Sequence, residues 1–245
     1  MRRPYFTGDA VPRGKALGCL PRVTHPGDGV WPVLAEVMPI LPRSEWEARL
    51  AQAPDLSPHV RKIKDQDGVG LCASDAASQT VEVARDVAGL PHVELSGASL
   101  YKQVNGGRDA GSAIDDNLEA LKSVGVVSVE FWGGANNWRQ REPTGFATEA
   151  KKFRVLEWFD LPDFGAFMSA LFYGFPICYG VFWEGGGHAI CAVKAVKDGN
   201  GWGCRFANSW GAWGDGGFGT MYESQISRGI RAFGAWCTRA TTYYV

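Results

Sequence analysis

The sequence predicts an α+β fold with two lobes, a helical lobe first and an antiparallel β-sheet or barrel lobe last. In the first half of the 245-residue chain, small and apolar residues recur at helical spacing, most clearly from Cys72 to about Ala88. In the last third the hydrophobic pattern changes to period two, with glycine-rich turns between short segments. Helices and strands that segregate along a chain in this way are typical of α+β proteins.

The first 60 residues are irregular. Residues 1–30 are rich in Pro, Gly and basic side chains and predict an extended or irregularly packed lead-in. A short helix to about Leu50 is expected, with Ser44 as its N-cap and Glu47 three residues later. We therefore divide the chain into an N-terminal arm (residues 1–60) and a domain of residues 61–245, with a helical lobe at about 61–125 and a β lobe at about 126–245.

Further elements follow in order. A short helix is expected within residues 95–101, and Ser112 is expected to cap a helix that ends at Gly125. Residues 126–160 predict loops, and Asp163 is expected to cap a third helix, which ends near Gly174. The predicted strands are Ile177–Trp183, His188–Val196, Gly201–Asn208, Gly217–Tyr222 and Phe233–Tyr243.

Composition excludes several classes of function. Hydrophobic residues make up 45% of the chain and the net charge is −1, so nothing favours binding to nucleic acid or to an anionic membrane. No apolar run approaches the roughly 18 residues that a membrane span needs. The N-terminus lacks the apolar core of a secretory signal, which predicts a cytoplasmic or otherwise non-secreted protein, or one associated with a particle.

The six cysteines are dispersed, at positions 19, 72, 178, 191, 204 and 237. Their spacing does not resemble a zinc site, and we expect neither a metal nor another cofactor. A reducing compartment with few or no disulfides is the simplest interpretation, although one pair among the last four could lie close together in a sheet.

Cys72 stands at or near the first turn of its helix, after Gly68 and Gly70. The positive end of the helix dipole favours the thiolate there, and the thiolate is the nucleophilic form of cysteine. A buried, inert cysteine is the ordinary alternative, because free cysteine is among the most buried residue types. The case for catalysis therefore depends on partners elsewhere in the chain.

His188 and Asn208 are the candidate partners. His188 follows three glycines at the start of a predicted strand, and Asn208 closes the next strand. A hairpin would bring the two ends side by side, so that His188 acts as a general base for Cys72 while Asn208 orients the imidazole. Trp210 could shield that hydrogen bond from water. Gln66, six residues before Cys72, could form an oxyanion hole together with the Cys72 N–H.

These motifs, in this order, resemble the papain-like cysteine proteases. The resemblance rests on Gln66, Cys72, Gly-His-Ala at residues 187–189 and Asn-Ser-Trp-Gly at residues 208–211, and it covers about residues 41–222. His188 and Asn208 lie 116 and 136 residues after Cys72. Segments such as residues 41–46, 95–101 and 214–219 are more similar to bacterial and phage-type members than to plant or lysosomal ones.

The resemblance implies a role for each matched residue. Cys72 would be the nucleophile, His188 the base and acid, Asn208 the orienting residue and Gln66 the oxyanion donor. Gly111 and Ser112 are similar to the edge along which an extended peptide pairs its backbone. Gly187 and Trp210 are also expected to line the substrate site.

The sequence departs from the family pattern at several positions near Cys72. Ala73 replaces an aromatic residue, Val69 stands where a disulfide cysteine is usual, and Asp67 replaces a glycine. Asp75 lies one turn past Cys72, where an inward-pointing negative charge would oppose a thiolate. None of these changes removes a catalytic group, but they bear on efficiency and on substrate preference.

The function expected from this resemblance is hydrolysis of peptide bonds through a thioester acyl-enzyme, with a peptide or protein as substrate. Two alternatives remain open at this stage. The same chemistry could serve an isopeptidase, an amidase or a peptide ligase, or the fold could serve a structural or assembly role without catalysis. The N-terminal arm does not match the helical pro-segment of the family, so either no zymogen exists, or the arm lies across the cleft and regulates it, or it ties the domain into a larger assembly.

Overall fold

The computed structural model of the protein describes residues 10–24, 28 and 31–242. Its helices are α1 (Trp46–Leu50), α2 (Cys72–Val87), α3 (Gly97–Val104), α4 (Ile114–Ser123), α5 (Val129–Trp132), α6 (Phe146–Ala150), α7 (Phe164–Phe172), α8 (Trp213–Gly216) and α9 (Glu223–Phe233). Its strands are β1 (Val155–Asp160), β2 (Ile177–Trp183), β3 (Gly186–Asp198), β4 (Gly201–Ala207), β5 (Phe218–Tyr222) and β6 (Ala235–Thr241). Short 3₁₀ turns cover Leu34–Glu36, Arg43–Glu45, Ser57–His59 and Ala135–Asn137.

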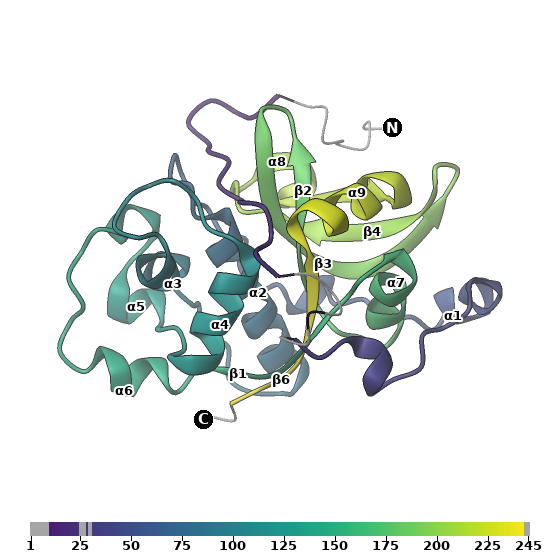
Figure 1. The fold of residues 1–245 in the computed structure, drawn as a ribbon, viewed down its shortest axis with the longest axis horizontal. Coiled ribbons are helices and arrows are strands. Elements are labelled where there is room, and N and C mark those ends of the chain that lie inside the picture. Colours follow the sequence, from purple (N-terminus) through teal and green to yellow (C-terminus); the bar gives the residue numbers. More distant parts are fainter. Residues whose placement is uncertain (1–9, 25–27, 29–30, 243–245) are drawn as a thin grey trace.

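The α+β class and the two-lobed arrangement are confirmed. Helices α3 to α6 gather on one side of the molecule, and most of the sheet lies on the other side with α7 and α9 (Figure 1). The sheet is open and antiparallel, with the order β1-β6-β2-β3-β4-β5. Helix α2 lies between the helical side and the sheet.

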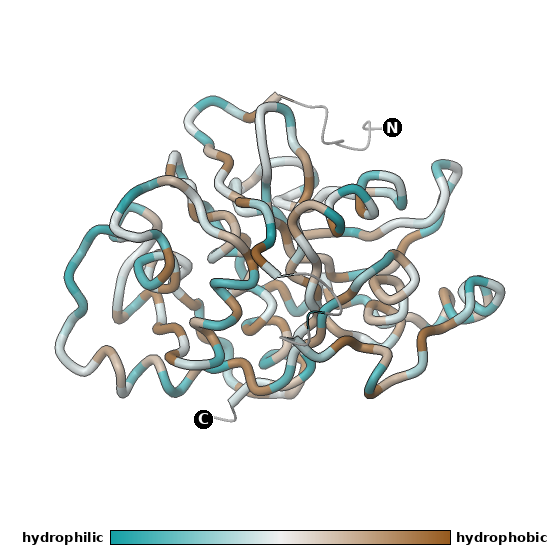
Figure 2. Tube along the Cα trace, in the orientation of Figure 1, coloured by the Kyte–Doolittle hydropathy of each residue, from teal (hydrophilic) through white to brown (hydrophobic). Residues whose placement is uncertain are grey.

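Small side chains let α2 pack closely against the sheet. Ala73, Ala76 and Ala77 are buried in one cluster with Cys178 on β2 and Ala189 on β3. On its other side the sheet packs against α7 and α9 through larger side chains, including Phe167, Tyr179 and Phe206. Apolar residues accordingly concentrate in the interior, while hydrophilic ones colour the outer loops (Figure 2).

The predicted strands are present, with β3 beginning two residues earlier than expected and β6 ending at Thr241. Tyr243, the predicted end of the last strand, lies outside the described residues, as do the first nine residues of the arm. Several elements were missed. Residues 126–160 contain the short helices α5 and α6 as well as β1, and the short helix α8 and helix α9 flank β5. Among the described residues, no helix combines the length and the apolar character that crossing a lipid bilayer requires.

Two of the predicted helix caps are wrong. Ser44 lies inside a 3₁₀ turn, and α1 begins after Glu45 without a side-chain cap. Burial of Trp46, whose indole donates to the Leu41 carbonyl, fixes the start of that helix instead. Ser112 precedes α4 by two residues, and its hydroxyl accepts a hydrogen bond from Asn117. The cap predicted at Asp163 is confirmed, since its carboxylate accepts from the Ala166 amide.

Candidate active site

Cys72 is the first residue of α2 and is fully buried. The loop before it is held from the helical side, where the Asp109 carboxylate accepts from the Gly70 amide at 2.9 Å. The Tyr101 hydroxyl donates to the same carboxylate and accepts from the Gly111 amide. This chain of bonds fixes the Cys72 loop relative to the edge that carries Gly111.

His188 and Asn208 are brought together as their positions on β3 and after β4 predict. His188 Nε2 lies 2.7 Å from Asn208 Oδ1. The Ser209 amide donates to the same Oδ1 at 2.8 Å, which fixes the orientation of the Asn208 amide. Because Oδ1 is an acceptor, Nε2 carries the proton and Nδ1 has the free lone pair. Within the described residues, Nδ1 has no hydrogen-bond partner.

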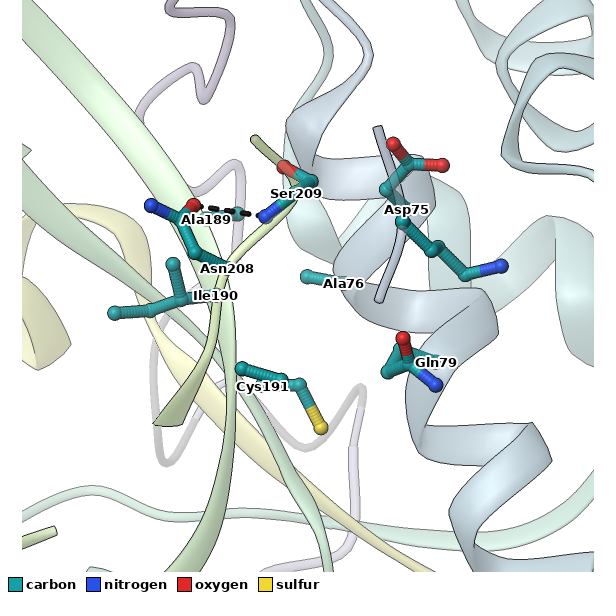
Figure 3. Close-up of a pocket in the computed structure, with 10 residues that line it drawn as sticks. Asp75, Ala76, Gln79, Ala189, Ile190, Cys191, Asn208 and Ser209 are labelled. Atoms are coloured by element: carbon teal, nitrogen blue, oxygen red, sulfur yellow. Dashed lines mark hydrogen bonds between the residues drawn. The ribbon is translucent and has the colours of Figure 1, made fainter. Parts of the chain in front are cut away.

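Aromatic rings enclose the His188–Asn208 pair. The Trp210 indole stacks on the imidazole at 4.5 Å between centroids, and Trp183 meets the imidazole edge-on at 5.4 Å. Trp213 packs against both indoles. Behind Asn208, a cavity of about 10 Å³ lies between α2 and the sheet, lined by Asp75, Gln79 and Cys191 among others (Figure 3).

Gln66 is fully buried. Its Nε2 donates to the Val69 carbonyl at 2.8 Å and to the Ala16 carbonyl at 3.1 Å. Its Oε1 accepts from the Ser209 hydroxyl at 2.6 Å. Ser209 therefore orients both the Gln66 amide and the Asn208 amide, a role that the sequence argument did not assign to it.

Asp67, the departure beside Gln66, has a left-handed backbone with φ of 50°, unlike every other non-glycine residue in the described part of the chain. A glycine adopts this conformation at little cost, which explains why the family pattern has one there. The Asp67 amide donates to the Asp65 carboxylate, and the Asp67 carboxylate accepts from Asn136 at 3.0 Å. These local bonds hold the strained position.

A segment of the N-terminal arm fills the space between the Ser112 edge and the start of β3 at Gly187, which we call the groove. We call residues 10–24 the arm segment. Figure 1 shows it, in dark purple, descending between the two sides of the molecule. The Gly18 and Cys19 amides donate to the Gly187 carbonyl at 3.2 and 3.1 Å. The Ser112 amide donates to the Gly18 carbonyl, and the Leu20 amide donates to the Ser112 carbonyl, so that the arm and the Ser112 edge pair in parallel.

Ser112 and Gly187 therefore pair their backbone with an extended segment, which here belongs to the chain itself. Cys19 is buried in the same apolar cluster as Cys72, Ala189 and Phe233. A β-carbon on Gly18 would lie 2.0 Å from the Gly70 carbonyl oxygen, and one on Gly187 would lie 2.2 Å from the Cys19 carbonyl oxygen. Only glycines allow so close an approach at these two positions.

This burial affects the protonation of both Cys72 and His188. Desolvation raises the pKa of Cys72 to about 12, although hydrogen bonds from the backbone of Ala189 and Gly18 oppose the rise. Desolvation also lowers the pKa of His188 to about 4. With the arm segment in place, the pair is a neutral thiol and a neutral imidazole at pH 7.

Asp75 is buried one turn into α2, and its charge adds to the rise in the pKa of Cys72. Its own pKa is raised to about 7, chiefly by burial and against the opposing charge of Lys64. Lys64 forms its ion pair with Glu82 at 2.7 Å instead. The Asp75 carboxylate, which was expected to oppose the thiolate, is therefore partly protonated and neutral at neutral pH.

All six cysteines are free thiols. Cys178 and Cys191 face each other across β2 and β3 in register. Burial raises the pKa of each of the five other than Cys72 as well. Ordinary thiol reactivity is thus suppressed throughout the molecule.

The arrangement of helix, sheet and groove matches solved cysteine proteases. Xylellain, a cysteine protease from Xylella fastidiosa, superposes with a TM-score of 0.75 at 20% identity, covering 95% of this chain and 99% of that one. The fold is papain-like. Procathepsin B S9 from Trypanosoma congolense (TM-score 0.68, 15% identity, 91% and 85% covered) and procathepsin L 3 from Tenebrio molitor larval midgut (0.65, 17%, 93% and 76%) share it. No protein-family profile and no curated protein sequence matches the chain.

Within the papain-like fold, several of the residues predicted from the sequence contact one another or the arm segment. His188 pairs with Asn208, Gln66 binds the arm segment at Ala16, and Gly187 and Ser112 pair their backbone with the arm segment beside Cys72. Gly111 lies beside Ser112 and is fixed by Tyr101. Sequence reasoning missed Ser209 and the arm residues that fill the groove. Ser209 lies inside the Asn-Ser-Trp motif, which is the signal that could have drawn attention to it.

Proposed function

We propose that the chain is a cysteine peptidase whose own arm segment holds it latent. The observation that carries the proposal is the peptide already seated in the groove. Its Ala16 carbonyl oxygen accepts from Gln66 Nε2, and the Gly18 backbone hydrogen-bonds to the Cys72 sulfur. A groove that binds extended backbone at the thiol is suited to present a substrate carbonyl there.

In the proposed mechanism, Cys72, His188, Asn208 and Gln66 each have a separate role. After the arm segment leaves, His188 Nδ1 accepts the Cys72 proton, and the sulfur attacks the substrate carbonyl carbon. The oxyanion is stabilised by Gln66 Nε2 and the Cys72 N–H. The His188 imidazolium, oriented by Asn208, protonates the leaving amine, and water then hydrolyses the thioester.

Substrates of the peptidase would be peptides or proteins bound in extended form along Ser112 and Gly187. Residues 16–20 are committed to the groove in this structure, which favours an intramolecular role for them over attachment to a larger assembly. Transfer to an acceptor other than water, as in an isopeptidase or a ligase, would use the same groups. The products of the assay below distinguish these outcomes.

The test uses Gly18→Ala in the full chain. The new methyl group would meet the Gly70 carbonyl oxygen at 2.0 Å, so the arm segment must lift. We expect hydrolysis of a fluorogenic casein substrate, and labelling of Cys72 by a peptidyl epoxide, to increase about tenfold or more over the wild-type chain, since 1.4 kcal/mol of lost arm binding gives that factor.

Leu20→Ala is the matched control, because this arm side chain is 42% exposed and its truncation leaves the backbone contacts in place. Gly18→Ala, Cys72→Ser supplies the inactive baseline. If Gly18→Ala shows no turnover and its Cys72 is labelled no faster than the other five thiols, the enzyme proposal fails.

A further inference from the structure

Arg22 anchors the arm segment in a buried acidic pocket. Its Nη2 lies 2.6 Å from Asp160 Oδ2, and the two side chains are only 2% and 1% exposed. The Arg22 guanidinium also lies over the Trp236 ring, 4.9 Å from its centroid. Its Nε donates to the Thr24 carbonyl, and its backbone amide donates to the Ala232 carbonyl. The pocket thus contacts both the plane and the edge of one guanidinium group.

A second carboxylate lies beside this pocket. Asp115, in the first turn of α4, is 3% exposed, and its Oδ2 accepts from the Val23 and Thr24 amides and the Thr24 hydroxyl. Its Oδ1 has no hydrogen-bond partner within the described residues. The negative charge of Asp115 raises the pKa of Asp160, although burial is the larger cause and Arg22 opposes both. The two carboxylates are therefore close enough to interact.

Within the described residues, the arm segment supplies the cation that pairs with Asp160 and the three hydrogen bonds to Asp115, while the Leu161 backbone also donates to Asp160. When the arm segment lifts, Asp160 loses Arg22, and Asp115 loses Val23 and Thr24. A carboxylate left unpaired in a buried pocket is costly, whereas a replacement cation with the same hydrogen-bond geometry restores the pairing. The planar guanidinium fork suits a carboxylate and an indole face better than an ammonium group does.

The pocket is also within reach of a peptide in the groove. Arg22 follows Gly18 by four residues, and between them the Leu20 amide is bound to the Ser112 carbonyl. An extended peptide that follows the path of the arm segment would place its side chains against the same pocket residues.

We propose that the pocket formed by Asp160, Asp115 and Trp236 is a specificity subsite for an arginine side chain of the substrate, which Arg22 occupies while the arm segment is in place. This inference rests on the proposed peptidase function for its substrate. The pocket itself is tested independently of catalysis, by the binding of a free guanidinium compound.

The binding test uses the full chain with Arg22→Ala, which vacates the pocket, and methylguanidinium as the probe. We expect a saturable rise in Tm of about 3 to 6 °C when the probe is tenfold above its dissociation constant. Methylammonium should give a clearly smaller rise. Arg22→Gln, which keeps most of the side-chain length, replaces Arg22→Ala if the latter fails to fold.

Two controls locate the effect. Arg22→Ala, Asp160→Asn should lose the response, because the carboxylate that pairs with the guanidinium is gone. Arg43→Ala, which removes an arginine from the exposed ion pair with Glu223, should show no saturable rise. Absence of a shift in Arg22→Ala, an equal shift with methylammonium, or a shift that survives Asp160→Asn would each overturn the proposal.

A peptide library then tests the link to substrate. The Gly18→Ala, Arg22→Ala protein, in which the arm segment is displaced and the pocket is vacant, should prefer peptides with arginine within four residues of the cleaved bond, and adding Asp160→Asn should remove at least tenfold of that preference. If methylguanidinium binds but no peptide is cleaved, the peptidase proposal fails and the pocket stands. If peptides are cleaved without an arginine preference, the subsite proposal fails and the peptidase stands.

Discussion

Gln66 Nε2 donates a hydrogen bond to the Ala16 carbonyl oxygen at 3.1 Å, across 50 residues of sequence. The side chain that the sequence assigns to oxyanion stabilisation thus already binds a peptide carbonyl, supplied by the arm segment. The same amide would serve inhibition in the closed state and catalysis in the open state. Changing it should therefore affect these two states in opposite directions.

Gln66→Glu tests this dual role. Glutamate keeps an oxygen near the Ser209 hydroxyl but loses the donor that faces Ala16. In the Gly18→Ala background, where the arm is already displaced, we expect kcat to fall about 10²- to 10³-fold, because one oxyanion donor is lost. In the otherwise wild-type chain, labelling of Cys72 should become faster, because the arm loses the same hydrogen bond.

Steady-state kinetics and labelling followed by mass spectrometry measure these two effects. Asn136→Ala is the matched control, since it removes a neighbouring exposed contact to Asp67 and leaves the groove intact. Unchanged turnover in Gly18→Ala, Gln66→Glu would remove Gln66 from the catalytic groups.

The pH dependence of Cys72 alkylation should report the arm segment directly. Burial raises the pKa of the thiol to about 12 in the closed state. The rate with iodoacetamide should then rise about tenfold per pH unit between pH 7 and 10, because only the thiolate reacts. In Gly18→Ala, where water and the His188 imidazole reach the sulfur, the rate should be higher at pH 7 and rise less steeply.

Cys72→Ser identifies the peptide that carries the label in this experiment. Its other five thiols are buried and should stay slow in both chains. Parallel pH profiles for the wild-type chain and Gly18→Ala would mean that the arm segment does not control the thiol.

The sequence predicted most of the site because its residues lie at ends of regular elements. Asn208 directly follows β4, and His188 lies near the start of β3, so pairing of the two strands was enough to place the imidazole beside the amide. Cys72 was placed by the helix pattern that begins at it. These inferences depend on local periodicity, which a single sequence shows directly.

The position at which the arm segment binds could not be predicted from local periodicity. It binds mainly through backbone groups, and its pairing with Ser112 and Gly187 leaves no side-chain pattern in the sequence. The Arg22–Asp160 pair joins residues 138 positions apart. The sequence alone does not show which arginine pairs with which aspartate. Helix α9 was different, since Ile226, Ile230 and Phe233 recur at helical spacing and could have revealed it.

Two buried groups near the site should oppose each other in the pH dependence of stability. The pKa of His188 is lowered to about 4, so the unfolded chain binds more protons between pH 6.5 and 4, and His188 destabilises the fold as pH falls through that window. The pKa of Asp75 is raised to about 7, so the folded chain binds more protons than the unfolded chain between pH 7 and 4. The contribution of Asp75 to the free energy of unfolding therefore increases as pH falls through that range.

Single variants should separate the two contributions. Relative to the wild-type chain, Asp75→Asn should lose stability more steeply between pH 7 and 4, and His188→Gln should lose it less steeply, each by roughly 3 kcal/mol across the window. Urea denaturation at a series of pH values measures both. Identical pH slopes in the three proteins would contradict the assignment of buried, neutral side chains to both positions.

The orientation of His188 gives the last prediction. Asn208 Oδ1 accepts from both His188 Nε2 and the Ser209 amide, so replacing Asn208 by alanine frees the imidazole to rotate and leaves that amide without its acceptor. In the Gly18→Ala background we expect Asn208→Ala to lower kcat about tenfold, the factor that corresponds to one lost hydrogen bond of about 1.4 kcal/mol. Asn208→Asp keeps an acceptor oxygen and adds a negative charge, so it should retain more activity than Asn208→Ala and raise the pKa of His188, as followed by NMR of the imidazole. Equal activity of the alanine and asparagine forms would show that the Trp210 and Trp183 rings suffice to hold the imidazole, and the orienting role would pass from Asn208 to them.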